Sequence, residues 1–276
     1  MNDLENAADA TAPLGVATPF ALTGRKVLAL LRELGAFALF LLMALARIFT
    51  LPLKPQRILE QIHFIGMKSL FVVALTGLFT GMVLGLQGYY VLIKFGSETA
   101  LGVMVALALI RELGPVLTAL MVTGRAGSSM AAEIGIMRIS EQIDALDTMD
   151  IDPVKFLVSP RLAAAIVSFP LLTALFDVIG IMGGYLTGVI MLGVNSGTFM
   201  GRLENGVEWV DVSGGFLKSL AFAIIVSSVC CYLGYTTDRR GGGFGARGVG
   251  NATTAAVVTS SVLVLVFDYV LTSFLM

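Results

Sequence analysis

Charged residues are scarce in this chain. Only 13% of its 276 residues are Asp, Glu, Lys or Arg, whereas 57% are hydrophobic and the mean hydropathy is +0.90. Soluble domains carry about 25% charged residues, so this chain has too little polar surface for an ordinary soluble protein. The composition predicts an integral membrane protein.

The residues of most catalytic and metal sites are equally rare. Histidine occurs once, as His63, and the two cysteines, Cys230 and Cys231, are neighbours within an apolar run, as is typical of small buried side chains. The glycine-rich segment 238–252 lacks the phosphate-binding pattern GxxxxGK[ST]. We therefore expect no catalytic residues, no metal ligands, no cofactor in this chain and no nucleic-acid partner. Any energy source must be a gradient or another chain.

Five apolar runs are each about 20 residues or longer, the length that crosses a hydrocarbon core of roughly 30 Å. They lie at residues 69–95, 100–123, 162–194, 216–235 and 252–276. In the first run, Gly77, Gly81 and Gly85 recur every four residues and share one helix face, which predicts close contact with another helix. The fold class we predict is an all-α integral membrane protein with five transmembrane helices.

The N-terminal region is harder to assign. Residues 1–24 are small and polar, without the basic start of a signal peptide, and predict a mobile N-terminus. In residues 25–50, Arg32, Glu33 and Arg47 leave only a short uncharged stretch, which favours a helix lying in the membrane interface; a sixth span is the alternative. Residues 51–68 resemble a short amphipathic helix. We treat residues 25–276 as one transmembrane domain.

Basic residues predict the orientation, because cytoplasmic loops are enriched in Lys and Arg. With the N-terminus inside, the outer side holds only Lys94, Arg202 and Lys218, and the cytoplasmic side holds fourteen: Arg25, Lys26, Arg32, Arg47, Lys54, Arg57, Lys68, Arg125, Arg138, Lys155, Arg161, Arg239, Arg240 and Arg247. This places the C-terminus outside and the loop at residues 124–160 in the cytoplasm.

Two adjacent charges lie within the second apolar run. Arg111 and Glu112 are about 100° apart around a helix, so each needs its own partner or a wet cavity. Pro115 displaces the carbonyl of residue 111 from the helical hydrogen-bond ladder. Pairing within the bundle and contact with a substrate headgroup both remain open for these charges, and Asp177 and Asp268 are candidate partners or members of a proton relay.

The loop at residues 124–160 reads as two short helices. Met130, Ile134 and Met137 form an apolar stripe on the first. Ser140 is the expected cap of the second, which has its own apolar stripe of Ile143, Leu146 and Met149. Such a surface helix between two spans predicts docking against another protein.

The same stretch resembles the signature of MlaE-type (YrbE) permeases, the membrane subunits of ABC transporters that act with MCE proteins in bacterial lipid transport. The resemblance rests on RELGPVLTALMVTGRAGSSMAAEIGIMRISEQIDAL and MDIDPVKFLVSPR, with QGYY, GSETALG and LVFDYVLTSFLM in support. It implies a homodimer in the bacterial inner membrane that moves phospholipids and maintains outer-membrane lipid asymmetry. The implied partners are cytoplasmic ATPase subunits that bind ATP and Mg, and a periplasmic MCE hexamer; a small STAS-type subunit is left open.

The resemblance also implies roles for particular residues. The polar border of the lipid pathway would be Arg111, Glu112 and Lys218, and the acyl-chain contacts would be Val91, Leu92, Phe95 and Leu113. The coupling region that seats on the ATPase would include Glu133, Met137, Glu141, Gln142, Ala145 and Leu146.

Two other classes of function compete with this one. A proton-coupled secondary transporter of an amphipathic substrate would use Glu112, Asp177 and Asp268 as a relay and would need no ATPase. A membrane enzyme is the weaker rival, because the sequence has no nucleophile elbow and no His and Cys constellation.

Overall fold

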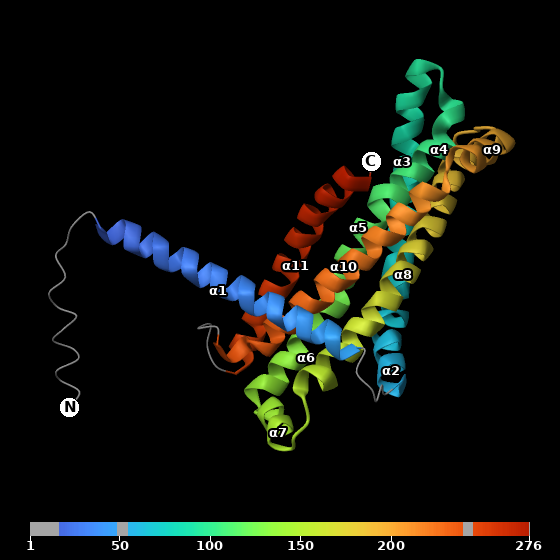
Figure 1. Cartoon of the computed structure of the whole chain (residues 1–276). Helices are drawn as coiled ribbons and strands as arrows, with labels where there is room; N and C mark the ends of the chain where they lie inside the picture. The colour runs from blue at the N-terminus through green and yellow to red at the C-terminus, as the bar shows by residue number, and fades with distance from the viewer. Residues whose placement is uncertain (1–16, 49–54, 240–244, 276) are drawn as a thin grey trace, which may run out of the picture. The chain divides into compact units, whose positions relative to one another are not determined.

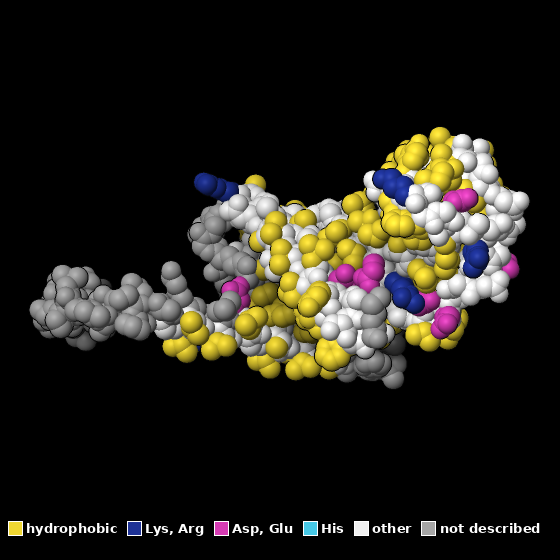
Figure 2. All heavy atoms as spheres, turned by 90° about the horizontal axis from the view of Figure 1, so that it is seen from above, with side chains coloured by type: hydrophobic (Ala, Val, Ile, Leu, Met, Phe, Trp, Pro, Cys, Tyr) yellow, Lys and Arg dark blue, Asp and Glu magenta, His cyan; other side chains and the backbone are white. Residues whose placement is uncertain are grey.

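The computed structural model describes residues 17–48, 55–239 and 245–275, and every regular element in them is helical (Figure 1). Five helical segments are long and apolar enough to cross a membrane: Pro55–Phe95, Glu98–Ile139, Val154–Met191, Trp209–Tyr235 and Ala246–Leu275. Figure 2 shows hydrophobic side chains over much of the visible surface, with charged side chains in small groups. The predicted all-α membrane fold with five spans is confirmed.

The chain forms two compact units, Met1–Leu42 and Met43–Met276. Helix α1 (Ala17–Ile48) runs through this boundary and is not among the five candidate spans. It begins at Ala17, so residues 17–24, expected in the mobile N-terminus, are helical; residues 1–16 lie outside the described part of the chain.

The first span packs closely on the third. Amphipathic α2 (Pro55–Ile65) leads through the turn η1 (Met67–Ser69) into α3 (Leu70–Leu92) and η2 (Ile93–Phe95). Gly77, Gly81 and Gly85 are buried in α3, and a Cβ added at Gly81 would collide with the backbone of Gly180 on α8. The predicted glycine face is therefore a close helix–helix contact.

The second span is interrupted twice by π-helical turns. After η3 (Glu98–Ala100), it runs through α4 (Leu101–Ala108), η4 (Leu109–Leu113), α5 (Gly114–Val122), η5 (Thr123–Gly127) and α6 (Ser128–Ile139). Elements η4 and η5 are the π-helical ones. The first of them ends two residues before Pro115, whose ring cannot fit a regular α-helical ladder.

A short helix then leads into the third span. Helix α7 (Gln142–Thr148) is followed by η6 (Val154–Val158), α8 (Ser159–Tyr185) and η7 (Leu186–Met191). The predicted cap of α7 was wrong. The Ser140 hydroxyl donates to the Ile136 carbonyl of the preceding helix, and Glu141 occupies the N-cap position with a left-handed backbone, φ 57°.

The last two spans are joined at one end by η8 (Thr237–Arg239). Helix α9 (Ser196–Gly206), absent from our sequence expectations, precedes α10 (Trp209–Tyr235), and α11 (Ala246–Leu275) closes the chain. Phe199 of α9 is fully buried, with its ring edge-on to Tyr185. Lys218, counted above with the outer basic residues, lies inside α10 and is buried.

Candidate functional site

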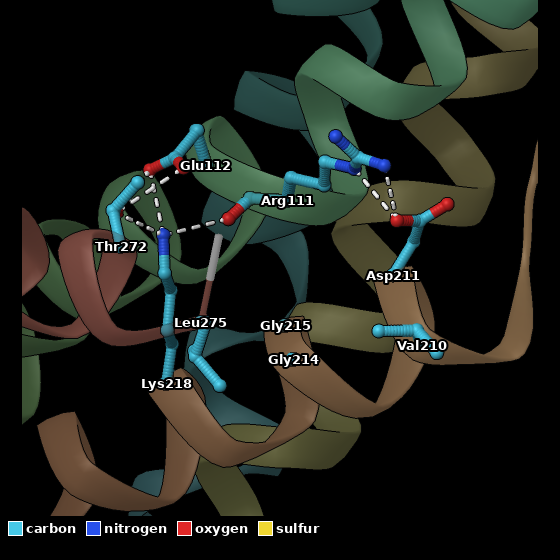
Figure 3. Close-up of a pocket in the computed structure, with 9 residues that line it drawn as sticks. All are labelled: Arg111, Glu112, Val210, Asp211, Gly214, Gly215, Lys218, Thr272 and Leu275. Carbon is cyan, nitrogen blue, oxygen red and sulfur yellow. Dashed lines mark hydrogen bonds and ion pairs between the residues drawn. The ribbon is translucent and has the colours of Figure 1, made fainter.

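Three of the spans line an open cavity of about 240 Å³ that holds several charged side chains (Figure 3). Its walls come from η4, from the first part of α10 and from the end of α11. The lining residues are Arg111, Glu112, Val210, Asp211, Gly214, Gly215, Lys218, Thr272 and Leu275. All three elements contribute lining residues, so the cavity depends on how these spans pack.

Lys218 is the centre of this cavity's polar network. Its side chain is 3% exposed, and its Nζ donates to Glu112 Oε2 at 2.7 Å, to Thr272 Oγ1 at 2.7 Å and to the Arg111 carbonyl at 2.9 Å. Asp268 Oδ1 lies 3.2 Å from the same ammonium as an ion pair, but without hydrogen-bond alignment. An ammonium has three donors, so all of them are occupied by the protein.

Arg111 has a different partner. Its Nε donates to Asp211 Oδ1 at 2.7 Å, and its Nη2 contacts the same oxygen. Asp211 is itself fixed, because its Oδ2 accepts from the Glu208 backbone N–H at 3.0 Å in a capping box at the start of α10. The Arg111 side chain remains 41% exposed while that of Asp211 is 5% exposed, so the guanidinium keeps free N–H donors beside the cavity.

The local backbone explains why these groups meet. Pro115 has no N–H to offer the Arg111 carbonyl, and Lys218 donates to that carbonyl instead. Helix α10 can approach because residue 215 is glycine: a Cβ there would collide with the Ile110 carbonyl. The expectation that Arg111 and Glu112 need separate partners is therefore confirmed, with Asp211 and Lys218 in those roles.

The cavity's charges nearly balance. Arg111 and Lys218 face three carboxylates, those of Glu112, Asp211 and Asp268. Charged groups within a span are tolerated when they pair and face protein or water, and this arrangement does both. What remains available is donor capacity on Arg111 and acceptor capacity on Glu112, whose side chain is 34% exposed.

The structure brings together only part of the predicted lipid-contact set. Arg111, Glu112 and Lys218 all line the cavity, whereas Val91, Leu92, Phe95 and Leu113 are not among its lining residues. Val91 and Phe95 are exposed on the outside of their helix, and the acyl-chain role of these four residues stays a prediction. Asp177, the other candidate partner, keeps one buried oxygen without a hydrogen bond in the described chain.

Sequence reasoning missed two members of the network. Asp211 follows Glu208 by three residues at the start of an apolar run, a pattern related to the capping box, so it had a detectable signal. Thr272 had none, because a threonine near the end of an apolar helix usually bonds its own backbone, as this one also does at 2.8 Å to the Asp268 carbonyl.

The predicted coupling residues lie at the opposite end of the bundle, on α6, α7 and the turn between them (Figure 1). Glu133, Glu141, Gln142 and Ala145 are exposed, and Met137 and Leu146 are half-buried. The apolar stripes behave differently from our expectation, because Met130, Ile134 and Ile143 are fully buried against their own chain. Of the predicted stripe residues, Met149 is exposed as expected, and Ile136, which was in neither stripe, adds further exposed apolar surface.

Two arginines tie this region to the spans. Arg138 at the end of α6 contacts Asp144 on α7 and Asp238 after α10, each at 2.8 Å. Arg161 on α8 contacts Glu133 on α6 at 2.9 Å. A displacement of α7 would therefore act on α10, the helix that carries Lys218 and Asp211.

Comparison with known proteins places this sequence in a family. The family model described as "Permease MlaE" matches residues 58–274. The "Intermembrane phospholipid transport system permease protein MlaE" of Haemophilus influenzae is 43% identical over 257 residues, 91% of this chain and 94% of that protein. A "Probable ABC transporter permease protein" of Rickettsia bellii is 46% identical over 249 residues, 90% and 94% of the two chains.

A more distant relative comes from a plant. The chloroplastic protein "TRIGALACTOSYLDIACYLGLYCEROL 1" of Arabidopsis thaliana is 37% identical over 216 residues, which are 78% of this chain and 60% of that protein.

Proposed function

This chain belongs to the MlaE permease family, and on that premise we propose that it is the permease subunit of an ATP-driven ABC transporter for phospholipids. The transporter moves lipid between the bacterial inner membrane and a periplasmic MCE protein, and so maintains the lipid asymmetry of the outer membrane. The name of the Haemophilus relative supports phospholipid as the substrate, and that of the Rickettsia relative supports the ABC class.

One observation carries the assignment of the site: a charged network lines a cavity between three membrane spans. A phospholipid headgroup bound in this cavity would place its phosphate beside these charged side chains. Arg111 offers N–H donors in the planar arrangement that suits phosphate oxygens, and Glu112 offers an acceptor for a headgroup amine. Lys218 is occupied by protein acceptors and therefore positions Glu112 and α10 rather than serving as the main ligand.

The cavity volume sets which part of the lipid enters. About 240 Å³ is below the 300–1,000 Å³ of typical pockets for drug-sized ligands, so the cavity accommodates a headgroup but not two acyl chains. The chains would then lie on apolar surface, for which Val91, Leu92, Phe95 and Leu113 are the proposed contacts.

The energy for lipid transport comes from partner subunits. The permease itself is non-catalytic, and ATP and Mg bind to a cytoplasmic ATPase that seats on α6 and α7 through Glu133, Met137, Glu141, Gln142, Ala145 and Leu146. The basic-residue distribution supports a cytoplasmic N-terminus and a periplasmic C-terminus. A second copy of the chain, an MCE hexamer and, where one is present, a STAS-type subunit complete the complex.

The proton-coupled alternative is less well supported. Two of its three relay carboxylates, Glu112 and Asp268, share the ammonium of Lys218. A relay through them would have to break these ion pairs in each cycle.

Affinity purification of the chain from its native membrane in mild detergent tests the proposal. Mass spectrometry of the co-purifying proteins and lipids should find an ATPase, an MCE protein and phospholipid. Recovery of a stable complex without any nucleotide-binding subunit would refute the ABC assignment and favour the proton-coupled carrier.

A further inference from the structure

A second cavity lies at the same end of the bundle as α7, opposite the end that holds the Lys218 network (Figure 1). It is open to the surface, has a volume of about 770 Å³ and is lined by residues of α2, η6 and the start of α8, namely Pro55, Gln56, Arg57, Glu60, Gln61, Phe156, Leu157, Pro160 and Arg161. None of these residues belongs to the cavity around Lys218 or to the proposed ATPase contact.

Two of the lining residues carry polar atoms that lack partners. Arg161 is 7% exposed, and although its Nη1 donates to the Leu157 carbonyl and its Nη2 contacts Glu133, its buried Nε has no acceptor among the described residues. The buried Oε1 of Gln61 has no donor there. Buried polar groups are normally hydrogen-bonded, so a bound species that offers both an acceptor and a donor would complete the hydrogen bonds of this wall.

The wall of the second cavity also carries side chains of both charges. Arg57 lies with its guanidinium 3.6 Å from the centre of the Phe156 ring, a stacking that leaves the edge of the guanidinium free for hydrogen bonds. Neither Arg57 nor Glu60 forms an ion pair within the described part of the chain.

We infer that this second cavity binds an amino-phosphate zwitterion of the phosphoethanolamine type. Its phosphate faces Arg57 and Arg161, and its ammonium faces Glu60 and Gln61. A zwitterion satisfies the orphan donor and the orphan acceptor together, which a simple anion does not. The volume exceeds that of the first cavity and accommodates a whole headgroup with its glycerol.

The position of α2 favours a membrane lipid as the source of this headgroup. The helix is amphipathic, leads through η1 into the long apolar helix α3, and carries Leu59 at 63% exposure. A lipid of the adjacent leaflet would reach the cavity from the side. The membrane setting of this inference rests on the proposed function, but the ligand site is independent of the Lys218 network.

Native mass spectrometry of the full chain, purified with its partner subunits, tests the inference. The complex is titrated with phosphatidylethanolamine, with phosphatidylglycerol of the same acyl chains, and with soluble glycerophosphoethanolamine. We expect Arg57→Gln and Gln61→Leu each to weaken one phosphatidylethanolamine binding event by about tenfold or more, as for a lost hydrogen bond to a charged group. Arg202→Gln and Gln87→Leu, at exposed positions on α9 and α3, are the matched controls and should bind normally.

The comparison of ligands identifies the source and the chemistry. Binding of the diacyl lipid alone supports a membrane source, and equal binding of glycerophosphoethanolamine supports a soluble one. Equal affinity for phosphatidylglycerol, or binding unaffected by both substitutions, would overturn the inference. Arg111→Gln separates the two sites, because it should remove lipid from the first cavity only. The effects of Arg57→Gln and Gln61→Leu on the second cavity can therefore be interpreted even if the proposed headgroup site at Arg111 proves wrong.

Discussion

Replacing Lys218 by Met should destabilise the protein more than removing either of its carboxylate partners. Methionine keeps the length of the side chain but removes the charge. The substitution leaves Glu112 and Asp268 facing the position that the ammonium occupied, and leaves the Arg111 carbonyl without the donor that Pro115 cannot supply. Glu112→Gln, in contrast, leaves Lys218 paired with Asp268.

The magnitudes follow from burial. Lys218 is 2% exposed, and removing one member of a buried ion pair costs about 3–5 kcal/mol. Glu112 is about one-third exposed, and glutamine retains a hydrogen-bond acceptor, so Glu112→Gln should cost about 1–2 kcal/mol. The double variant combines Lys218→Met with Glu112→Gln, so only the Asp268 carboxylate is left without the ammonium. The double variant should therefore be more stable than the sum of the single effects predicts.

The free energy of unfolding can be measured in mixed micelles by titration with dodecyl sulphate. Lys94→Met is the control, because Lys94 is exposed at the end of the first span and should change stability by no more than about 0.5 kcal/mol. Equal costs for Lys218→Met and Glu112→Gln, or strict additivity in the double variant, would contradict the network described here.

Three further predictions concern packing and coupling. Gly81→Ala should destabilise the protein by about 1–3 kcal/mol, because its Cβ would meet the Gly180 backbone, whereas Gly250→Ala has open space and should be neutral in the same titration. Arg138→Gln should leave ATP hydrolysis by the complex intact but lower lipid movement per ATP, since it releases both Asp144 and Asp238; unchanged coupling would refute the role given to Arg138. Arg111→Ala should impair lipid transport more than assembly, and equal loss of both in a pull-down and a transport assay would assign Arg111 to bracing the bundle.

Much of the fold could be predicted because membrane spans are long and apolar. The glycine repeat of the first span indicated the close packing that the structure shows against α8. Helix ends were less predictable. Helix α9 and the early starts of α10 and α11 lie in segments that are polar enough to resemble loops, and Ser140 bonds backward to Ile136 rather than capping the next helix.

Site residues could be predicted where placing them within a membrane span costs free energy. Arg111, Glu112 and Pro115 stood out because charges and proline within a span need compensation. Their partners were less visible, because a pairing between residues about 100 positions apart, such as Arg111 with Asp211, depends on tertiary packing. The proposed acyl-chain contacts, which came from family resemblance, remain a prediction.

The most direct test of the central claim is ATP-dependent movement of labelled phospholipid by the reconstituted complex in proteoliposomes. Our account predicts transfer to the MCE partner that requires ATP, persists when the proton gradient is collapsed, and falls strongly in Arg111→Ala. Transfer that needs no ATPase subunit and stops when the proton gradient is collapsed would contradict it.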